Sequence, residues 1–115
     1  MRLIVHKEVV DGRDFSGKSL KNASFSESEA SGANFSGAAA LGAWFMNCDL
    51  SGANFSGARL RGAVFQDCDL THANFDGASL SGASFMNCDL SGANLEGAKT
   101  KGTIFTGTTT DGAIW

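Results

Sequence analysis

A five-residue period runs from Phe15 to the last residue, Trp115, and it constrains the fold more than any other feature of the chain. The central residue of most repeats is large and apolar, and a small residue stands two places before it in all but the first two repeats. A helix turns by about 100° per residue, so five residues move each apolar side chain about 140° around the axis and no stripe forms. In an extended segment the small residue and the central residue point to the same side. The two residues that follow the central one can then form a corner. The sequence therefore predicts short strands joined by regular corners.

A second, longer period sets the number of corners in each coil. Segments 42–54 (GAWFMNCDLSGAN), 62–74 (GAVFQDCDLTHAN) and 82–94 (GASFMNCDLSGAN) match one another and start 20 positions apart. Four repeats therefore make one coil with four sides. Coils stacked at the interstrand distance of about 4.8 Å place each residue above the one 20 positions earlier, and about five coils make a rod of roughly 25 Å.

These repeats resemble the pentapeptide-repeat family, whose consensus is A(N/D)Lxx. The resemblance is carried by residues 53–55 (Ala-Asn-Phe), 73–75 (Ala-Asn-Phe) and 93–95 (Ala-Asn-Leu), and it extends over nearly the whole chain. It implies a right-handed quadrilateral β-helix; the four sides also follow from the longer period, whereas the handedness rests on the resemblance. We expect an all-β protein with an N-terminal capping segment over residues 1–12 and the β-helix over residues 13–115.

The first ten residues and the overall composition predict one soluble domain. Leu3, Val5 and Val9, all at odd positions, predict a strand that caps the first coil, since the end of a solenoid otherwise exposes unpaired backbone. The net charge is −3 and no apolar run is long enough to cross a membrane. The N-terminal segment also lacks the length and cleavage-site chemistry of an export signal, so we expect a cytoplasmic protein.

Three cysteines, Cys48, Cys68 and Cys88, occupy the same inward position in successive coils. Their number is odd, and no His or carboxylate faces the core to complete a metal site. We expect them to be reduced, small packing residues, in keeping with a reducing compartment.

The sequence predicts neither an enzyme nor a cofactor or metal site. Apolar side chains are expected to fill the interior, and His6 and His72 lie far apart in the chain. No nucleophile, phosphate-binding or metal-ligand spacing is present. The pI of 5.2, with basic residues scattered along the sequence, also argues against nucleic acid. We expect no nucleic-acid or membrane partner.

Outward columns carry the candidate interaction residues. One column of asparagines is expected to form a ladder in which each amide bonds the next; it comprises Asn34, Asn54, Asn74 and Asn94. An acidic stripe runs along a neighbouring face and is either solvated or kept for a partner; it comprises Glu29, Asp49, Asp69 and Asp89. A column with Lys21, Arg61, Lys101 and Leu41 is interpreted as a solvated face.

An apolar patch is expected on the side whose inward column runs from Phe25 to Phe105. It is either ordinary surface or a contact surface for a partner, and Trp and Met are enriched at interfaces. Its residues are Trp44, Met46, Val64, Met86 and Ile104.

The C-terminal coil ends without a covering helix and exposes Phe105, Ile114 and Trp115. Trp115 either folds back over the last Phe or leaves an open edge for pairing. The family resemblance implies the second, because several members dimerise through their C-terminal coil. A homodimer through this end is therefore one expectation.

Three functions remain open. The first is a non-enzymatic, rigid interaction module that presents a flat side or its C-terminal end to a protein partner. The family resemblance implies an alternative, a DNA mimic that binds DNA gyrase in the manner of quinolone-resistance proteins. The third is a structural spacer without a specific partner.

Overall fold

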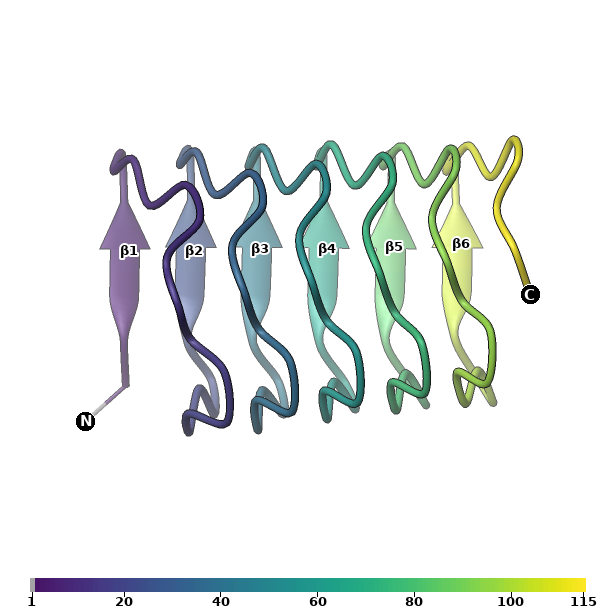
Figure 1. The fold of residues 1–115 in the computed structure, drawn as a ribbon, viewed down its shortest axis with the longest axis horizontal. Coiled ribbons are helices and arrows are strands. Elements are labelled where there is room, and N and C mark those ends of the chain that lie inside the picture. The colour runs from purple at the N-terminus through teal and green to yellow at the C-terminus, as the bar shows by residue number, and fades with distance from the viewer. Residues whose placement is uncertain (1) are drawn as a thin grey trace.

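The computed structural model describes residues 2–115 as an all-β solenoid (Figure 1). Six short strands form one parallel sheet in chain order, which confirms the predicted fold class. The strands are β1 (Ile4–His6), β2 (Ser24–Ser26), β3 (Trp44–Met46), β4 (Val64–Gln66), β5 (Ser84–Met86) and β6 (Ile104–Thr106).

The register between neighbouring strands is the same at every step and equals the longer period of the sequence, as predicted. In the sheet Phe25 pairs with Phe45. Isolated parallel bridges such as Glu29 with Asp49 repeat this offset on the other sides. The molecule measures 32 by 21 by 20 Å, longer than the expected stack because β1 adds a strand before the five that the repeats from Phe15 onward supply. Strand β1 lies in the segment expected to cap the rod, and it pairs with β2 in the same register.

A left-handed residue two places after the centre of the repeat makes the corners. Gly52 has φ of 66°, and the amide of Ala53 donates to the carbonyl of Leu50 at 3.0 Å, which closes a type II turn. Glycine fits this position because it has no Cβ to clash in the left-handed region. The corner after each strand of the sheet is different, since five of its six residues are not glycine, for example Asn47 and Asp67.

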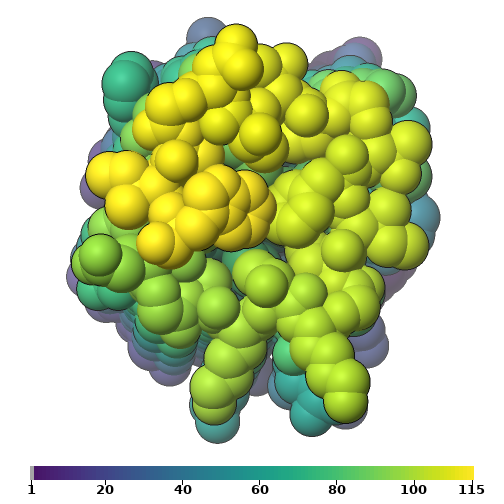
Figure 2. Space-filling view, turned by 90° about the vertical axis from the view of Figure 1, so that its right-hand side faces the viewer, coloured from purple at the N-terminus to yellow at the C-terminus, as the bar shows by residue number. Residues whose placement is uncertain are grey.

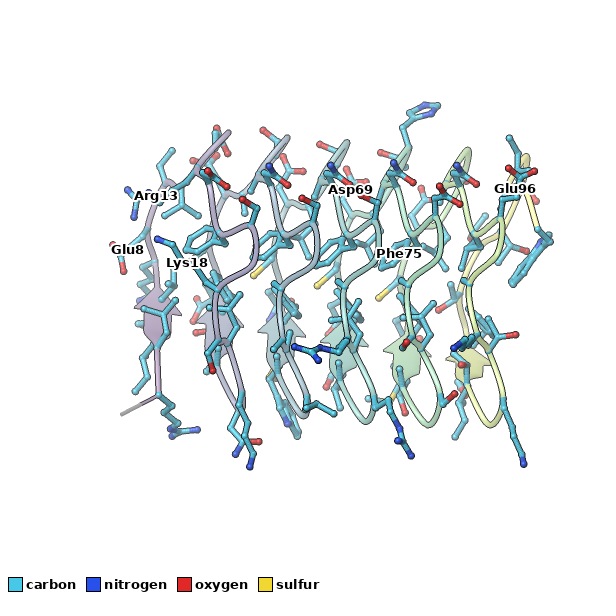
Figure 3. All side chains as sticks on the ribbon, turned by 60° about the horizontal axis from the view of Figure 1, so that its bottom comes forward. Glu8, Arg13, Lys18, Asp69, Phe75 and Glu96 are labelled. Atoms are coloured by element: carbon cyan, nitrogen blue, oxygen red, sulfur yellow. The ribbon has the colours of Figure 1, made fainter. Side chains whose placement is uncertain are left out.

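Two opposed columns of aromatic rings fill the centre of the rod. Within each column the rings stack, as Phe45 does on Phe65 at 4.7 Å, and across the core they meet edge to face, as Phe55 does with Phe65 at 5.5 Å. Leucines and alanines fill the other two sides. The seven phenylalanines from Phe25 to Phe85 are almost wholly buried. Figure 3 shows Phe75 inside the coil, between the outward side chains of the two flanking sides.

Candidate interaction surfaces

The packed interior leaves the candidate sites on the outside of the rod. Within residues 2–115 no group of three His, Cys, Asp or Glu side chains is placed to hold a metal ion. The same part of the chain contains no helix long and apolar enough to cross a membrane. An open hollow near the N-terminal end is lined by Arg2, Ser19, Lys21 and Asn22. The exposed His6 contacts the Ser26 hydroxyl at 2.7 Å and lies 3.9 Å from the exposed carboxylate of Glu27. His72 occupies a left-handed corner position.

The cysteine column is buried and has a second task besides packing. The single S–H donor of Cys68 is shared between two carbonyl oxygens, that of Gln66 at 3.3 Å and that of Phe45 at 3.2 Å. Ser28 and Thr108, at the two ends of the same column, donate to backbone carbonyls in the same way. This column therefore holds small side chains with an S–H or O–H donor in place of Ala, because the donor bonds a backbone carbonyl at the corner after each strand. This role was missed in the sequence, although Ser28 and Thr108 share the donor chemistry and signal it.

Contact with the neighbouring thiols and burial raise the pKa of the middle thiol. All three cysteines are free and buried. The adjacent thiols of Cys48 and Cys88, and then desolvation by burial, raise the pKa of Cys68. Only the thiolate is a good nucleophile, so Cys68 is protected from modification while the coil is intact.

The asparagine column does not form the expected ladder, and that prediction is wrong. The Asn54 side-chain oxygen accepts the amide of Ser56 at 2.9 Å, and Asn74 accepts the amide of Asp76 at 2.9 Å. Each amide thus bonds the next corner of its own coil, in an Asx turn, rather than the asparagine above. The bond to the corner amide forms in place of a bond to the next asparagine because that amide lies only two residues ahead in the same coil.

The three aspartates of the acidic stripe make the same local bonds. Asp69 accepts the amide of Thr71 at 3.0 Å and its hydroxyl at 2.7 Å, and Asp89 accepts the amide of Ser91 at 2.9 Å. Hydrogen bonds from Ser91 lower the pKa of Asp89. Parallel bridges join the four stripe residues in one column, as expected from the longer period. One oxygen of each of the three aspartates therefore forms the turn, and the other oxygen makes no hydrogen bond within the turn.

The apolar patch is divided by polar residues. Trp44 pairs with Val64, and both lie on the outer face of the sheet. Ser84 stands between Val64 and Ile104 in one column. In the other, Gln66 lies between Met46 and Met86. We therefore restrict the patch to Trp44, Met46 and Val64, of which Trp44 is the most exposed at 45%.

The C-terminal end has an open edge with an aromatic pair. Trp115 meets the ring of Phe105 edge to face at 5.5 Å but remains 59% exposed, and Ile114 is 55% exposed. Trp115 thus folds against the last Phe without covering the coil. Figure 2 shows this end of the rod as a four-sided outline with the final residues lying across part of it.

The structure also separates charge between two opposite sides, because residues ten positions apart lie across the coil from each other. Segments 18–22, 58–62 and 98–102 stack on one side, together with 38–42 and 78–82, and these five segments contain no Asp or Glu. This side, the basic face, holds six of the nine Lys and Arg residues, all exposed: Lys18, Lys21, Arg59, Arg61, Lys99 and Lys101.

The side across the coil, the acidic face, holds nine of the twelve Asp and Glu residues and one lysine, Lys7. In Figure 3 oxygen-bearing side chains, Asp69 among them, line the upper edge, and long nitrogen-ended side chains extend from the lower edge. The basic residues are therefore not scattered around the rod but gathered on one side of it. A count of charge per repeat position would have found both faces. The acidic residues are Glu8, Asp11, Glu27, Glu29, Asp49, Asp67, Asp69, Asp89 and Asp111.

Comparisons with known proteins agree with the solenoid. The family model described as "Pentapeptide repeat region" matches residues 42–115, and the one described as "Pentapeptide repeats (8 copies)" matches residues 11–38. Comparison with curated proteins finds no match.

Several solved structures have the same fold. A pentapeptide repeat protein from the cyanobacterium Cyanothece 51142 is 25% identical, with a TM-score of 0.79 over 99% of this chain and 85% of that one. One from the Arabidopsis thaliana thylakoid lumen is 38% identical, with a TM-score of 0.68 over 84% of this chain and 61% of that one. A trypsin-treated form of QnrB1, a plasmid-mediated fluoroquinolone resistance protein, is 29% identical, with a TM-score of 0.58 over 98% of this chain and 58% of that one.

Proposed function

Because the chain belongs to the pentapeptide-repeat family, we propose that it is a non-enzymatic interaction module that presents a rigid surface to a protein partner. The observation that carries this proposal is the rod itself, whose interior is filled by apolar side chains and whose backbone is hydrogen-bonded from coil to coil. Its charged side chains, and the polar groups able to contact a partner, therefore lie on the flat outer faces. A rigid face binds with little ordering cost, since its side chains sit on backbone already fixed by the ladder.

The favoured partner surface is the side around Trp44. This residue is 45% exposed beside Val64 and Met46 on the outer face of the sheet. Tryptophan anchors in a well-packed contact often dominate binding energy. Because β3 and β4 are held in one ladder, the three side chains keep a fixed arrangement.

The test is capture of partners from a cell extract with the wild-type chain and with Trp44→Ser. Serine is a matched replacement because Ser24 and Ser84 occupy the same column. Ile104→Ser, a change in the same column but outside the patch, is the control. We expect a specific partner to be lost with Trp44→Ser and kept with Ile104→Ser. A partner set that is the same for all three proteins would overturn the assignment of the patch.

The C-terminal end is proposed as a homodimer contact. Ile114 and Trp115 are more than half exposed in the last coil, beside the partly buried Phe105. Light scattering of the intact chain and of Trp115→Asp tests this. A dimer that becomes a monomer supports the contact, and the same monomeric mass for both proteins excludes it.

A second candidate, a DNA mimic that binds gyrase, is favoured by one observation. Nine carboxylates line one face, in the same type of rod as QnrB1. A supercoiling assay with increasing protein tests it, and Asp49→Asn combined with Asp69→Asn is the matched variant. Protection or inhibition that the variant loses would support mimicry, whereas no effect at high excess would exclude it.

A further inference from the structure

The basic and acidic faces are complementary surfaces on opposite sides of one rod. We propose that copies of this chain associate side by side, with the basic face of one rod against the acidic face of the next. This contact is separate from both the Trp44 patch and the C-terminal end. It goes beyond the proposed function, because its partner is the chain itself.

The axial repeats of the two faces match. Basic residues occur as pairs in alternate coils, namely Lys18 with Lys21, Arg59 with Arg61, and Lys99 with Lys101. The corresponding rows lie about 9.6 Å apart, while the acidic rows repeat at about 4.8 Å, because one coil is one interstrand step. Each basic row therefore meets two acidic rows when two rods lie side by side with their axes aligned.

The coils between the basic rows leave room for this contact. Their outward residues in the Arg59 column are Ala39 and Ser79, which are small and neutral. The longer basic side chains thus stand apart from one another with space on either side. Carboxylates of a second rod can enter between these side chains, and they meet no repulsion from acidic residues because the basic face contains no Asp or Glu.

Charge complementarity favours a second copy over the other anionic partners. A nucleic-acid duplex is convex and would contact only part of a flat face. A membrane would use the basic face and leave the nine carboxylates opposite without a role. A second copy uses both faces and carries the same repeat. Such a contact joins two different patches, so it is open-ended and gives rows of rods.

The chain provides matched replacements for a test. The basic-neutral variant carries Arg59→Ser, Arg61→Ser, Lys99→Ser and Lys101→Ser, since serine already occupies both columns at positions 79 and 81. The acid-neutral variant carries Asp49→Asn, Asp69→Asn and Asp89→Asn. Asparagine keeps the turn bond, as the neighbouring asparagine column shows. Asp76→Asn with Glu96→Gln removes two charges outside both faces and is the control.

The experiment is sedimentation velocity over a range of protein concentrations, at low and at high salt. The Debye length falls from about 30 Å at 0.01 M to about 3 Å at 1 M, so each protein at 1 M provides its own reference mass. At low salt we expect the wild type and the control to rise at least twofold in mass with concentration. Each variant alone should rise less in mass than the wild type, because the basic-neutral variant keeps only Lys18 and Lys21 on its basic face and the acid-neutral variant loses three of its nine carboxylates. An equimolar mixture of the two variants should reach twice the reference mass, because each partner keeps one active face.

Three results would overturn the proposal. The first is a wild type whose mass does not depend on salt or concentration. The second is association of either neutral variant alone to the same extent as the wild type. The third is binding of the wild type, but not the basic-neutral variant, to phosphatidylserine vesicles or duplex DNA without any self-association, which would assign the basic face to those ligands. Trp44→Ser should associate like the wild type, so a failure here is distinct from a failure of the apolar patch.

Discussion

Truncation of Phe65 to Ala tests whether the two ring columns carry the stability of the rod. The side chain is 0% exposed. It stacks on Phe45 at 4.7 Å and Phe85 at 4.8 Å, and it meets Phe55 and Phe75 edge to face at 5.5 and 5.9 Å. Phe→Ala changes in cores cost about 3–5 kcal/mol. Aromatic pairs add about 0.5–1.5 kcal/mol each beyond their buried area, and the backbone ladder on both sides resists collapse, so we expect a loss near about 5 kcal/mol.

Phe105→Ala is the matched comparison at the end of the same column. Phe105 is only partly buried and has one stacked neighbour, Phe85 at 5.3 Å, besides Trp115. We expect this change to cost about 1–2 kcal/mol, since less apolar area returns to water. Urea unfolding followed by circular dichroism separates the two. With a slope of about 2 kcal/mol/M, the midpoint should fall by about 2.5 M for Phe65→Ala and by under about 1 M for Phe105→Ala. A midpoint for Phe65→Ala no lower than that of Phe105→Ala would refute the reasoning.

Four further predictions concern the corners and the thiols. Gly52→Ala should cost about 1–2 kcal/mol in thermal unfolding because φ is 66° there, although the site is open; an unchanged melting temperature would contradict this. Asn54→Ala should cost about 0.5–1.5 kcal/mol through the lost corner bond, whereas Asn54→Asp should retain most of the stability, and equal losses for the two would exclude the Asx turn. The pKa of Asp89 is lowered by its hydrogen bonds from Ser91, so the ionised carboxylate stabilises the fold above the unfolded pKa of about 3.9. This stabilisation is lost as the pH falls through the lower folded pKa. Asp89→Asn should therefore flatten the acid limb of a curve of unfolding free energy against pH, and an unaltered limb would contradict this. Cys68 should react with a thiol reagent at pH 8 only after unfolding in urea, and labelling at Cys68 itself in the native protein would show that the coil opens.

The fold could be predicted because the same sequence period determines the strand register, the number of sides and the packing of the core. The aromatic columns, the four sides and the strand register all follow from spacing, and the structure places Phe45 on Phe65 as that spacing requires. The handedness of the corners also has a sequence signal, since glycine recurs two places after the centre of the repeat. Each local choice in these repeats agrees with the global fold.

The surface was harder to predict because side-chain bonds depend on detailed geometry. The Asn54 amide has two possible partners, the asparagine one coil away and the amide two residues ahead, and spacing alone does not choose between them. The apolar patch was predicted as continuous because Ser84 and Gln66 were not placed between its members. The two charged faces were missed for a similar reason, since residues far apart in sequence had to be sorted by side before their signs could be compared.

The constant register between coils has a consequence for insertions and deletions. Removing one whole coil takes out one layer and leaves every later side chain on its original side of the rod. Removing a single repeat instead turns everything after the cut by a quarter of a circle. Downstream of such a cut, the aspartate column would continue as asparagine, and the asparagine column would continue as the column that holds Arg59 and Lys99, although every repeat would still satisfy its own five-residue rule. The core would change as well, because each phenylalanine column would continue as a column of leucine or alanine. The lengths of related rods should therefore differ by whole coils wherever the outer faces matter, and drift by single repeats only where they do not.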